Sequence, residues 1–206
     1  MKIETFVIGI GSVNCYLVIN EKTKEVVIID PGDAPEYLIN HINKEGLEVK
    51  AILLTHGHFD HILGLPGFMA EFKVPVYAHE EEFKLLADDE LNVSRRVNRS
   101  YEFNDAEAVE DGDVLELAGM KFIVIHTPGH TSGCVSYYIA KEQVLFSGDT
   151  LFLGSVGRSD FVTSNTEDLK KSIKEKLLVL AEDTKVYPGH AGVTSIEYER
   201  KRNPYA

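Results

Sequence analysis

Four short strand-forming segments of the chain each lead into a turn that carries a histidine or an aspartate. The segments are Ala51–Leu54, Phe122–Ile125, Val144–Phe146 and Lys185–Tyr187, and the turns after them carry His56, His130, Asp149 and His190. Short apolar runs bounded by turn-forming residues predict β-strands. Strands that end at one edge of a sheet bring the residues after them together. We therefore expect a fold in which one sheet edge gathers all four turns.

The remaining segments predict further strands and helices. Strands are expected over Asn14–Ile19 and Glu25–Ile29, the second ending in the turn Asp30-Pro31-Gly32. One helix is expected over Glu36–Asn43, and a second directly after the first histidine-bearing turn. Two more are expected over roughly Glu80–Ala87 and from Thr166 onward. The apolar residues expected on the buried faces are Tyr37, Leu38 and Ile42 in the first helix, and Leu169, Ile173, Leu177 and Leu180 in the last.

The composition is that of a globular protein with an acidic surface. Lys and Arg total 21 against 33 Asp and Glu, so the net charge is 21 − 33 = −12, and such a surface repels nucleic acid. No apolar run approaches the roughly 20 residues of a membrane span. The polar residues near Met1 do not resemble a signal peptide, which makes a cytoplasmic location the expectation. Cys15 and Cys134 lie too far apart for metal-type spacing.

The segment Thr55–His61 is the strongest local signal for a metal site. It has the sequence Thr-His-Gly-His-Phe-Asp-His, which places four potential ligands within six positions. Residues two apart in an extended stretch point the same way, so His56 and His58 can share one metal. Asp60 and His61 are then available to a second. The alternative interpretation is a solvated, histidine-rich turn.

The other three turns mean less when they are taken singly. His130 could be an ordinary turn histidine, Asp149 could cap a helix, and His190 could lie in a surface loop. Each of them follows a predicted strand, however. Together with the four residues of the first segment they complete seven ligands, enough for two metals.

This arrangement resembles the metallo-β-lactamase superfamily, and specifically its glyoxalase II-like hydrolases. Further segments carry the resemblance: Asn14–Leu17, Ile29–Gly32, Ser147–Phe152, Gly157–Asp160 and Asn203–Tyr205. The resemblance implies an α/β fold, a four-layer αββα sandwich with metals at one edge of its two sheets. It also implies a single domain over residues 1–206, without the helical C-terminal domain that completes the glutathione pocket in larger members.

The resemblance also implies a role for each ligand. His56, His58 and His130 would hold one metal, Asp60, His61 and His190 the second, and Asp149 would bridge both. Five imidazoles and two carboxylates suit Zn²⁺, and would also accept Fe²⁺ or Mn²⁺. A hydroxide bridging the two metals would be the nucleophile, with Asp60 and Asp149 as the catalytic carboxylates. A thioester suits such a site, because a thiol has a pKa of only about 8.5 and departs readily.

Arg158 is the candidate contact to a small-molecule thioester substrate. It matches a basic residue that lies near the glutathione carboxylate in glyoxalase II proteins; a structural salt bridge is the alternative. Family members that bind glutathione have a tyrosine where this chain has Asp160, and Glu-Tyr where it has Ala191-Gly192. Thioester hydrolysis is therefore predicted more firmly than glutathione specificity. Asp30 either orients a ligand histidine or only begins its turn.

The main alternative function is that of the iron-dependent persulfide dioxygenases of the same superfamily. Cys134 and the segment Gly157–Phe161 match that group, whose single iron would use His56, His130 and Asp149. Glycine before His190 favours the hydrolases, since the dioxygenases more often have alanine there. A non-catalytic metal-binding module is a third class. The Asp60-His61 pair argues against β-lactamase activity, because β-lactamases of this fold generally lack the second histidine.

Overall fold

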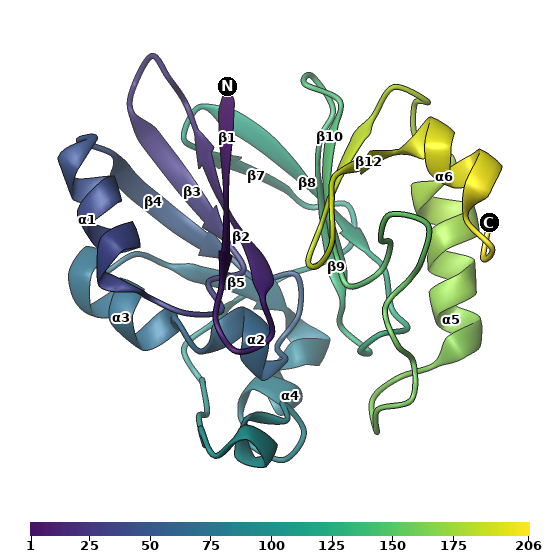
Figure 1. Cartoon of the computed structure of the whole chain (residues 1–206), viewed down its shortest axis with the longest axis horizontal. Helices are drawn as coiled ribbons and strands as arrows, with labels where there is room; N and C mark the ends of the chain where they lie inside the picture. Colours follow the sequence, from purple (N-terminus) through teal and green to yellow (C-terminus); the bar gives the residue numbers. More distant parts are fainter.

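The computed structural model describes all 206 residues, and its two six-stranded sheets pack face to face (Figure 1). The first sheet has the order β1-β2-β3-β4-β5-β6 and the second the order β12-β11-β10-β9-β8-β7. The first sheet contains β1 (Lys2–Ile8), β2 (Val13–Ile19), β3 (Glu25–Ile29), β4 (Glu48–Leu53), β5 (Val76–His79) and β6 (Glu107–Val109). The second contains β7 (Val114–Leu117), β8 (Met120–His126), β9 (Val135–Ile139), β10 (Val144–Gly148), β11 (Lys185–Pro188) and β12 (Thr194–Ser195).

Helices cover the outer face of each sheet. The α-helices are α1 (Glu36–Lys44), α2 (Phe59–Ile62), α3 (Leu65–Phe72), α4 (Phe83–Leu86), α5 (Thr166–Lys171) and α6 (Ile196–Arg202). Single turns of 3-10 helix occur at η1 (Glu80–Glu82) and η2 (Ser94–Val97), and η3 (Ser172–Leu177) is a π-helix. In Figure 1, α1 and α3 lie outside the first sheet and α5 and α6 outside the second. The predicted αββα sandwich is confirmed.

The alternation of side chains along β2 explains how the layers are held. Cys15 and Leu17 face the core shared with α1 and α3, whereas Tyr16 and Val18 face the core between the two sheets. A strand that is buried on both faces needs apolar residues at nearly every position. A third cluster, which includes Leu145 of β10, fills the space between the second sheet and α5 and α6. Three buried interfaces therefore separate four layers.

The direction of the strands determines where the ligand-bearing turns lie. In the second sheet β8 and β10 are both antiparallel to β9, and β11 is parallel to β10. These three strands thus run the same way and end at the same edge. In the first sheet β4 is parallel to its neighbours β3 and β5. The sheet edge predicted from the four strand-to-turn segments is present.

Three details differ from the sequence prediction. Tyr37 is on the solvent side of α1, with 59% of its surface exposed, while Leu38 and Ile42 are buried as expected. The late helix widens into the π-helix η3 and ends at Leu177, so Leu180 lies beyond it and is only half-buried. The pattern also missed strands, among them β1, β5 and β9.

No helix of the structure is long and apolar enough to span a lipid bilayer.

Candidate metal centre

All seven residues that the sequence singled out as ligands lie together at the common sheet edge. They form three overlapping groups whose potential ligand atoms lie within 4.8 Å of one another. The groups are His56, His58 and His130; His56, His61 and Asp149; and Asp60, His61 and His190. Because the groups share members, they form one continuous cluster and not separate sites.

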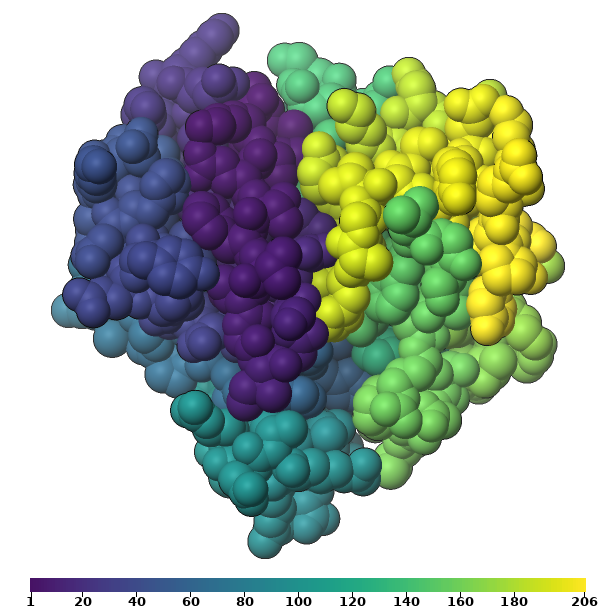
Figure 2. All heavy atoms as spheres, in the orientation of Figure 1, coloured from purple at the N-terminus to yellow at the C-terminus, as the bar shows by residue number.

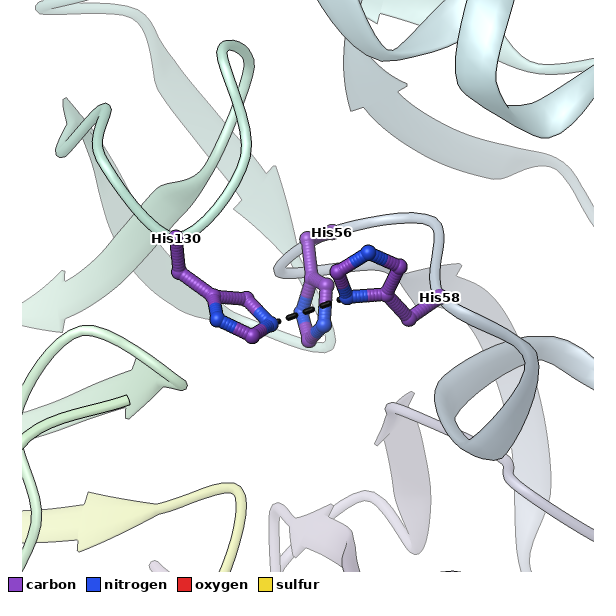
Figure 3. A group of neighbouring side chains, drawn as sticks. All are labelled: His56, His58 and His130. Carbon is purple, nitrogen blue, oxygen red and sulfur yellow. Dashed lines mark hydrogen bonds between the residues drawn. The ribbon is translucent and has the colours of Figure 1, made fainter. Parts of the chain in front are cut away.

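The first group joins two loops of different sheets. Figure 3 shows His56 and His58 on the loop after β4 and His130 on the loop after β8, with the imidazole rings facing one another. The Nδ1 atom of His58 lies 2.9 Å from Nε2 of His130. The centroid of the His56 ring lies 4.9 Å from that of His58 and 4.7 Å from that of His130. All three residues are buried.

Asp149 lies between the first group and the remaining ligands. Its Oδ1 is 3.4 Å from Nε2 of His61, and its Oδ2 is 3.6 Å from Nε2 of His130 and 3.7 Å from Nε2 of His190. The Asp60 carboxylate is 3.2 Å from Nε2 of the same His190. Asp149 does not cap a helix, because the chain after it continues without one. Its two oxygens therefore face both halves of the cluster.

A buried carboxylate outside the predicted ligand set orients two of the histidines. Asp30 Oδ2 lies 3.0 Å from Nδ1 of His61 and accepts a hydrogen bond of 2.6 Å from the Thr55 hydroxyl. Since that hydroxyl donates to Asp30, it can only accept from Nδ1 of His56, which is 3.2 Å away. We infer that, with a cation bound in the cluster, both rings keep their proton on Nδ1 and present the lone pair of Nε2 to it. Of the two roles open for Asp30, orientation of histidine is the one its contacts support.

His130 is oriented in the same way by the backbone. Its Nδ1 donates to the carbonyl oxygen of Arg158 at 2.7 Å, which leaves the lone pair of Nε2 directed at the cluster. Arg158 thus contributes to the centre through its main chain, a contact that no sequence pattern predicted.

The electrostatics of the cluster favour neutral imidazoles in its first group. Burial lowers the pKa of His56 well below its ordinary value and that of His58 to about 3, and burial also lowers the pKa of His130. Burial acts the same way on His61, but the carboxylates of Asp30 and Asp149 outweigh it and raise the pKa of that ring. Neutral imidazoles with lone pairs directed inward are metal ligands, and the carboxylates attract a cation.

Buried polar atoms without partners test whether the residues fit a metal. His56 Nε2, His61 Nε2 and Asp149 Oδ1 are buried and make no hydrogen bond within the protein. An unpaired buried polar atom costs about 1–3 kcal/mol, so several of them facing one point call for a ligand that satisfies all of them together. A divalent cation does so, and the nitrogen and oxygen donors suit Zn²⁺, Fe²⁺ or Mn²⁺. The residues present fit a metal centre.

A pocket of about 330 Å³ opens onto the cluster. Apart from five of the cluster residues, its lining consists of Phe59, Val93, Phe152, Arg158 and Phe161. Figure 2 shows a recess in the corresponding place, between the teal segment near residue 95 and the green segment near residue 160. The apolar walls were not predicted as site residues, although Phe161 lies in the Gly157–Phe161 segment that the resemblance singled out. No serine, threonine or cysteine lines the pocket.

The Arg158 side chain lies at the rim of this pocket. Its guanidinium forms two hydrogen bonds with the Asp160 carboxylate, of 2.6 and 2.7 Å, and lies 4.4 Å from the centroid of the Phe161 ring. The side chain is 62% exposed. Asp160, the residue that departs from the family pattern, is therefore the partner of Arg158, the only lysine or arginine in the pocket lining.

Comparison with known sequences places the chain among metallo-hydrolases. A model of the metallo-beta-lactamase superfamily matches residues 8–190. The chain is 38% identical to the probable metallo-hydrolase YqgX of Bacillus subtilis, over all of this chain and 97% of that protein. It is 35% identical to hydroxyacylglutathione hydrolase GloC of Haemophilus influenzae, over all of this chain and 98% of that protein.

Solved structures agree with these sequence matches. The BLEG-1 B3 metallo-beta-lactamase superposes with a TM-score of 0.93 and 40% identity, covering 99% of both chains. TTHA1623 in a di-iron-bound form gives a TM-score of 0.88 and 36% identity, covering 98% of this chain and all of the other. ETHE1 from Myxococcus xanthus gives 0.81 and 27% identity, covering 99% of this chain and 84% of the other.

Proposed function

Because the chain belongs to the metallo-beta-lactamase superfamily, we propose that it is a dinuclear metal-dependent hydrolase of thioesters. One observation carries the proposal: every potentially reactive side chain in the pocket lining is histidine, aspartate or arginine. With these histidines and aspartates engaged as metal ligands, and with no serine, threonine or cysteine, the site would hydrolyse an acyl bond through activated water. The two halves of the cluster, joined by Asp149, offer ligands for two ions.

The cluster assigns a task to each side chain. His56, His58 and His130 would hold one ion, Asp60, His61 and His190 the other, and Asp149 both. Bound there, two divalent ions supply Lewis acidity and lower the pKa of water enough to give a nucleophile at neutral pH. Asp30 and Thr55 keep the imidazoles in one tautomer and orientation. The phenyl rings of the pocket wall exclude bulk water from the reacting bond.

Several features support a thioester as substrate. The histidines and aspartates of the pocket lining would all be metal ligands, so none of them is left to protonate a poor leaving group, and a thiolate departs without a general acid. The name of the Haemophilus relative, hydroxyacylglutathione hydrolase, points to the same bond. The proposal is for thioesters and not for glutathione thioesters in particular, because Asp160 already pairs with Arg158, the only lysine or arginine of the pocket lining.

The alternative function predicted from the sequence is that of the persulfide dioxygenases. Gly189 argues against it. A Cβ atom at this position would lie 2.2 Å from Oδ1 of Asp149 and 2.8 Å from Cε1 of His61, so alanine would displace one of them. Position 189 therefore has room for the glycine that is typical of the hydrolases. It has no room for the alanine that is more frequent in the dioxygenases. β-Lactams also belong among the candidate substrates, because of the similarity to BLEG-1 and despite the Asp60-His61 pair.

A panel of three assays on the metal-loaded protein tests the proposal. We expect hydrolysis of acyl-glutathione or simpler acyl thioesters, with little turnover of β-lactams and no oxygen uptake with glutathione persulfide. A protein that turns over only β-lactams, or only consumes oxygen, would exclude the thioesterase.

Replacing Gly189 by alanine should reduce kcat by tenfold or more. The added methyl group must move Asp149 or His61, and a misplacement near 1 Å costs about 10² in rate. Gly192→Ala is the matched control, because the nearest atom to its new methyl group is 3.7 Å away in Leu153. The measurement is kcat together with metal content for both variants. Wild-type kcat in Gly189→Ala would show that Asp149 does not need its present position.

Arg158→Met should raise KM for an anionic thioester by about tenfold while kcat changes little, since a charge-assisted hydrogen bond contributes about 1.5 kcal/mol. Asp160→Asn should lower KM up to about fivefold, because an exposed ion pair costs no more than ~1 kcal/mol to open. An uncharged thioester is the control substrate and should respond to neither change. If the KM for each substrate were the same in wild type and in both variants, Arg158 would have a structural role alone.

A further inference from the structure

Glu82 is a fully buried glutamate that lies next to the metal centre without belonging to it. It ends the 3-10 turn η1, and its side chain has no exposed surface. A buried carboxylate is costly unless several donors compensate for it. Its donors come from two loops that are far apart in the sequence.

The hydrogen bonds of Glu82 connect the two ligand loops of the first group. Its Oε2 accepts from the backbone N–H of Gly57, at 2.8 Å; Gly57 lies between His56 and His58. Its Oε1 accepts from the Thr131 hydroxyl, at 2.5 Å, and from the N–H of Gly133, at 2.8 Å. Thr131 directly follows His130 in the sequence. One carboxylate therefore receives a bond from beside each of the three histidines shown in Figure 3.

Close packing fixes the same two loops against the segment that carries Glu82. A Cβ atom on Gly133 would lie 2.6 Å from the backbone nitrogen of Glu82 and 2.8 Å from its Oε1. A Cβ atom on Gly57 would lie 2.8 Å from Cδ2 of Leu85 and 2.9 Å from Cδ2 of Leu86. Both loops thus approach η1 and α4 as closely as glycine allows. This steric contact is independent of the hydrogen bonds.

We propose that Glu82 is a positioning residue that sets the separation between the His56–His58 loop and the His130 loop, and so the affinity of the first metal group. It touches no ligand side chain and acts through the backbone on either side of them. The proposal rests on metal binding by His56, His58 and His130, and it holds whichever bond the centre hydrolyses.

The charge and shape of the carboxylate matter separately. Burial raises the pKa of Glu82, while the three donors favour its ionised form. Glutamine keeps the volume but puts an NH₂ group against at least one of the donors, so Glu82→Gln breaks the connection to one loop. Glu82→Asp keeps the charge and shortens the reach. The order of metal affinity should therefore be wild type, then Glu82→Asp, then Glu82→Gln.

Glu199 provides a matched control. It is equally buried and accepts from the Thr194 hydroxyl at 2.5 Å, from Nδ2 of Asn203 at 2.7 Å and from the N–H of Gly154. Like Glu82 it connects separate segments, but it contacts no loop of the first group. Glu199→Gln should lower the melting temperature without changing metal affinity.

The experiment measures Co²⁺ and Zn²⁺ dissociation constants by chelator competition, with the Co²⁺ absorption spectrum as a second readout, for the four proteins. The same measurement in a His190→Ala background reports mainly on the first group.

We expect Glu82→Gln to weaken binding of the metal in the first group by 10–100-fold and to shift its spectrum, with a smaller effect on the metal in the second group. First-metal affinity within twofold of wild type, or an equal loss in Glu199→Gln, would overturn the proposal. If Glu82→Gln does not fold, Glu82→Asp gives the same comparison. No substrate is used, so a failed thioester assay leaves this test unaffected.

Discussion

Asp149→Ala should lower kcat for thioester hydrolysis by about 10³-fold or more while the fold persists. The carboxylate faces both halves of the cluster, so its loss removes a ligand from each proposed metal, and several kcal/mol correspond to a factor of this size. The fold should survive, because Asp149 Oδ1 makes no hydrogen bond that the sheets depend on. The measurements are kcat, metal content and circular dichroism.

Asp183→Ala is the control for this variant, since that aspartate is exposed and lies far from the cluster in the loop before β11. It should retain wild-type kcat and metal content. If Asp149→Ala kept more than about a tenth of wild-type kcat, a bridging role worth several kcal/mol would be excluded.

His190→Ala should abolish thioester hydrolysis to a similar extent and would separate the two candidate enzymes. His190 belongs to the second group only, with its Nε2 3.2 Å from Asp60. A dioxygenase iron held by His56, His130 and Asp149 would not need it. His190 is also a cleaner target than His61, because it is 25% exposed whereas His61 is fully buried against Asp30. Its removal therefore disturbs the packing least.

The measurement compares thioester hydrolysis and persulfide-dependent oxygen uptake in wild type and His190→Ala. Hydrolysis by the wild type that falls at least a hundredfold in the variant is the expected result. Oxygen uptake that survives the change, with no thioester cleavage by the wild type, would favour the dioxygenase.

The gathering of the ligands could be predicted because each one leaves a local signal. His56, His58, Asp60 and His61 occupy consecutive and alternate positions of one short segment, and His130, Asp149 and His190 each follow a strand. The family predicted from these segments is confirmed by the match over residues 8–190. Their assignment to particular metals is a proposal that the variants above test.

Apart from Asp30 and Arg158, the residues around the ligands leave no such signal. Glu82 is the last of three consecutive glutamates and would ordinarily be solvated; its burial depends on the Gly57 and Gly133 loops, distant in the sequence. Val93 lines the pocket with a φ of 69°, a conformation that a β-branched residue rarely adopts. Such positions are determined by contacts between distant segments, which periodicity and turn chemistry do not encode.

The missed strand β1 and the early end of the late helix also have physical causes. β1 is an edge strand in which the polar residues Lys2, Glu4 and Thr5 interrupt the apolar pattern. The π-helix η3 shifts the register by which Leu180 would have continued the buried stripe of the late helix. A prediction based on 3.6 residues per turn cannot foresee this widening.

Metal content per chain tests the central claim most directly. After removal of metal and reconstitution with Zn²⁺, Fe²⁺ or Mn²⁺, elemental analysis of the wild type should find close to two ions per chain. His190→Ala should retain about one, because only the group with Asp60 and His61 loses a ligand. One tightly held iron in the wild type, with no second ion at saturating supply of any of the three metals, would contradict the dinuclear hydrolase.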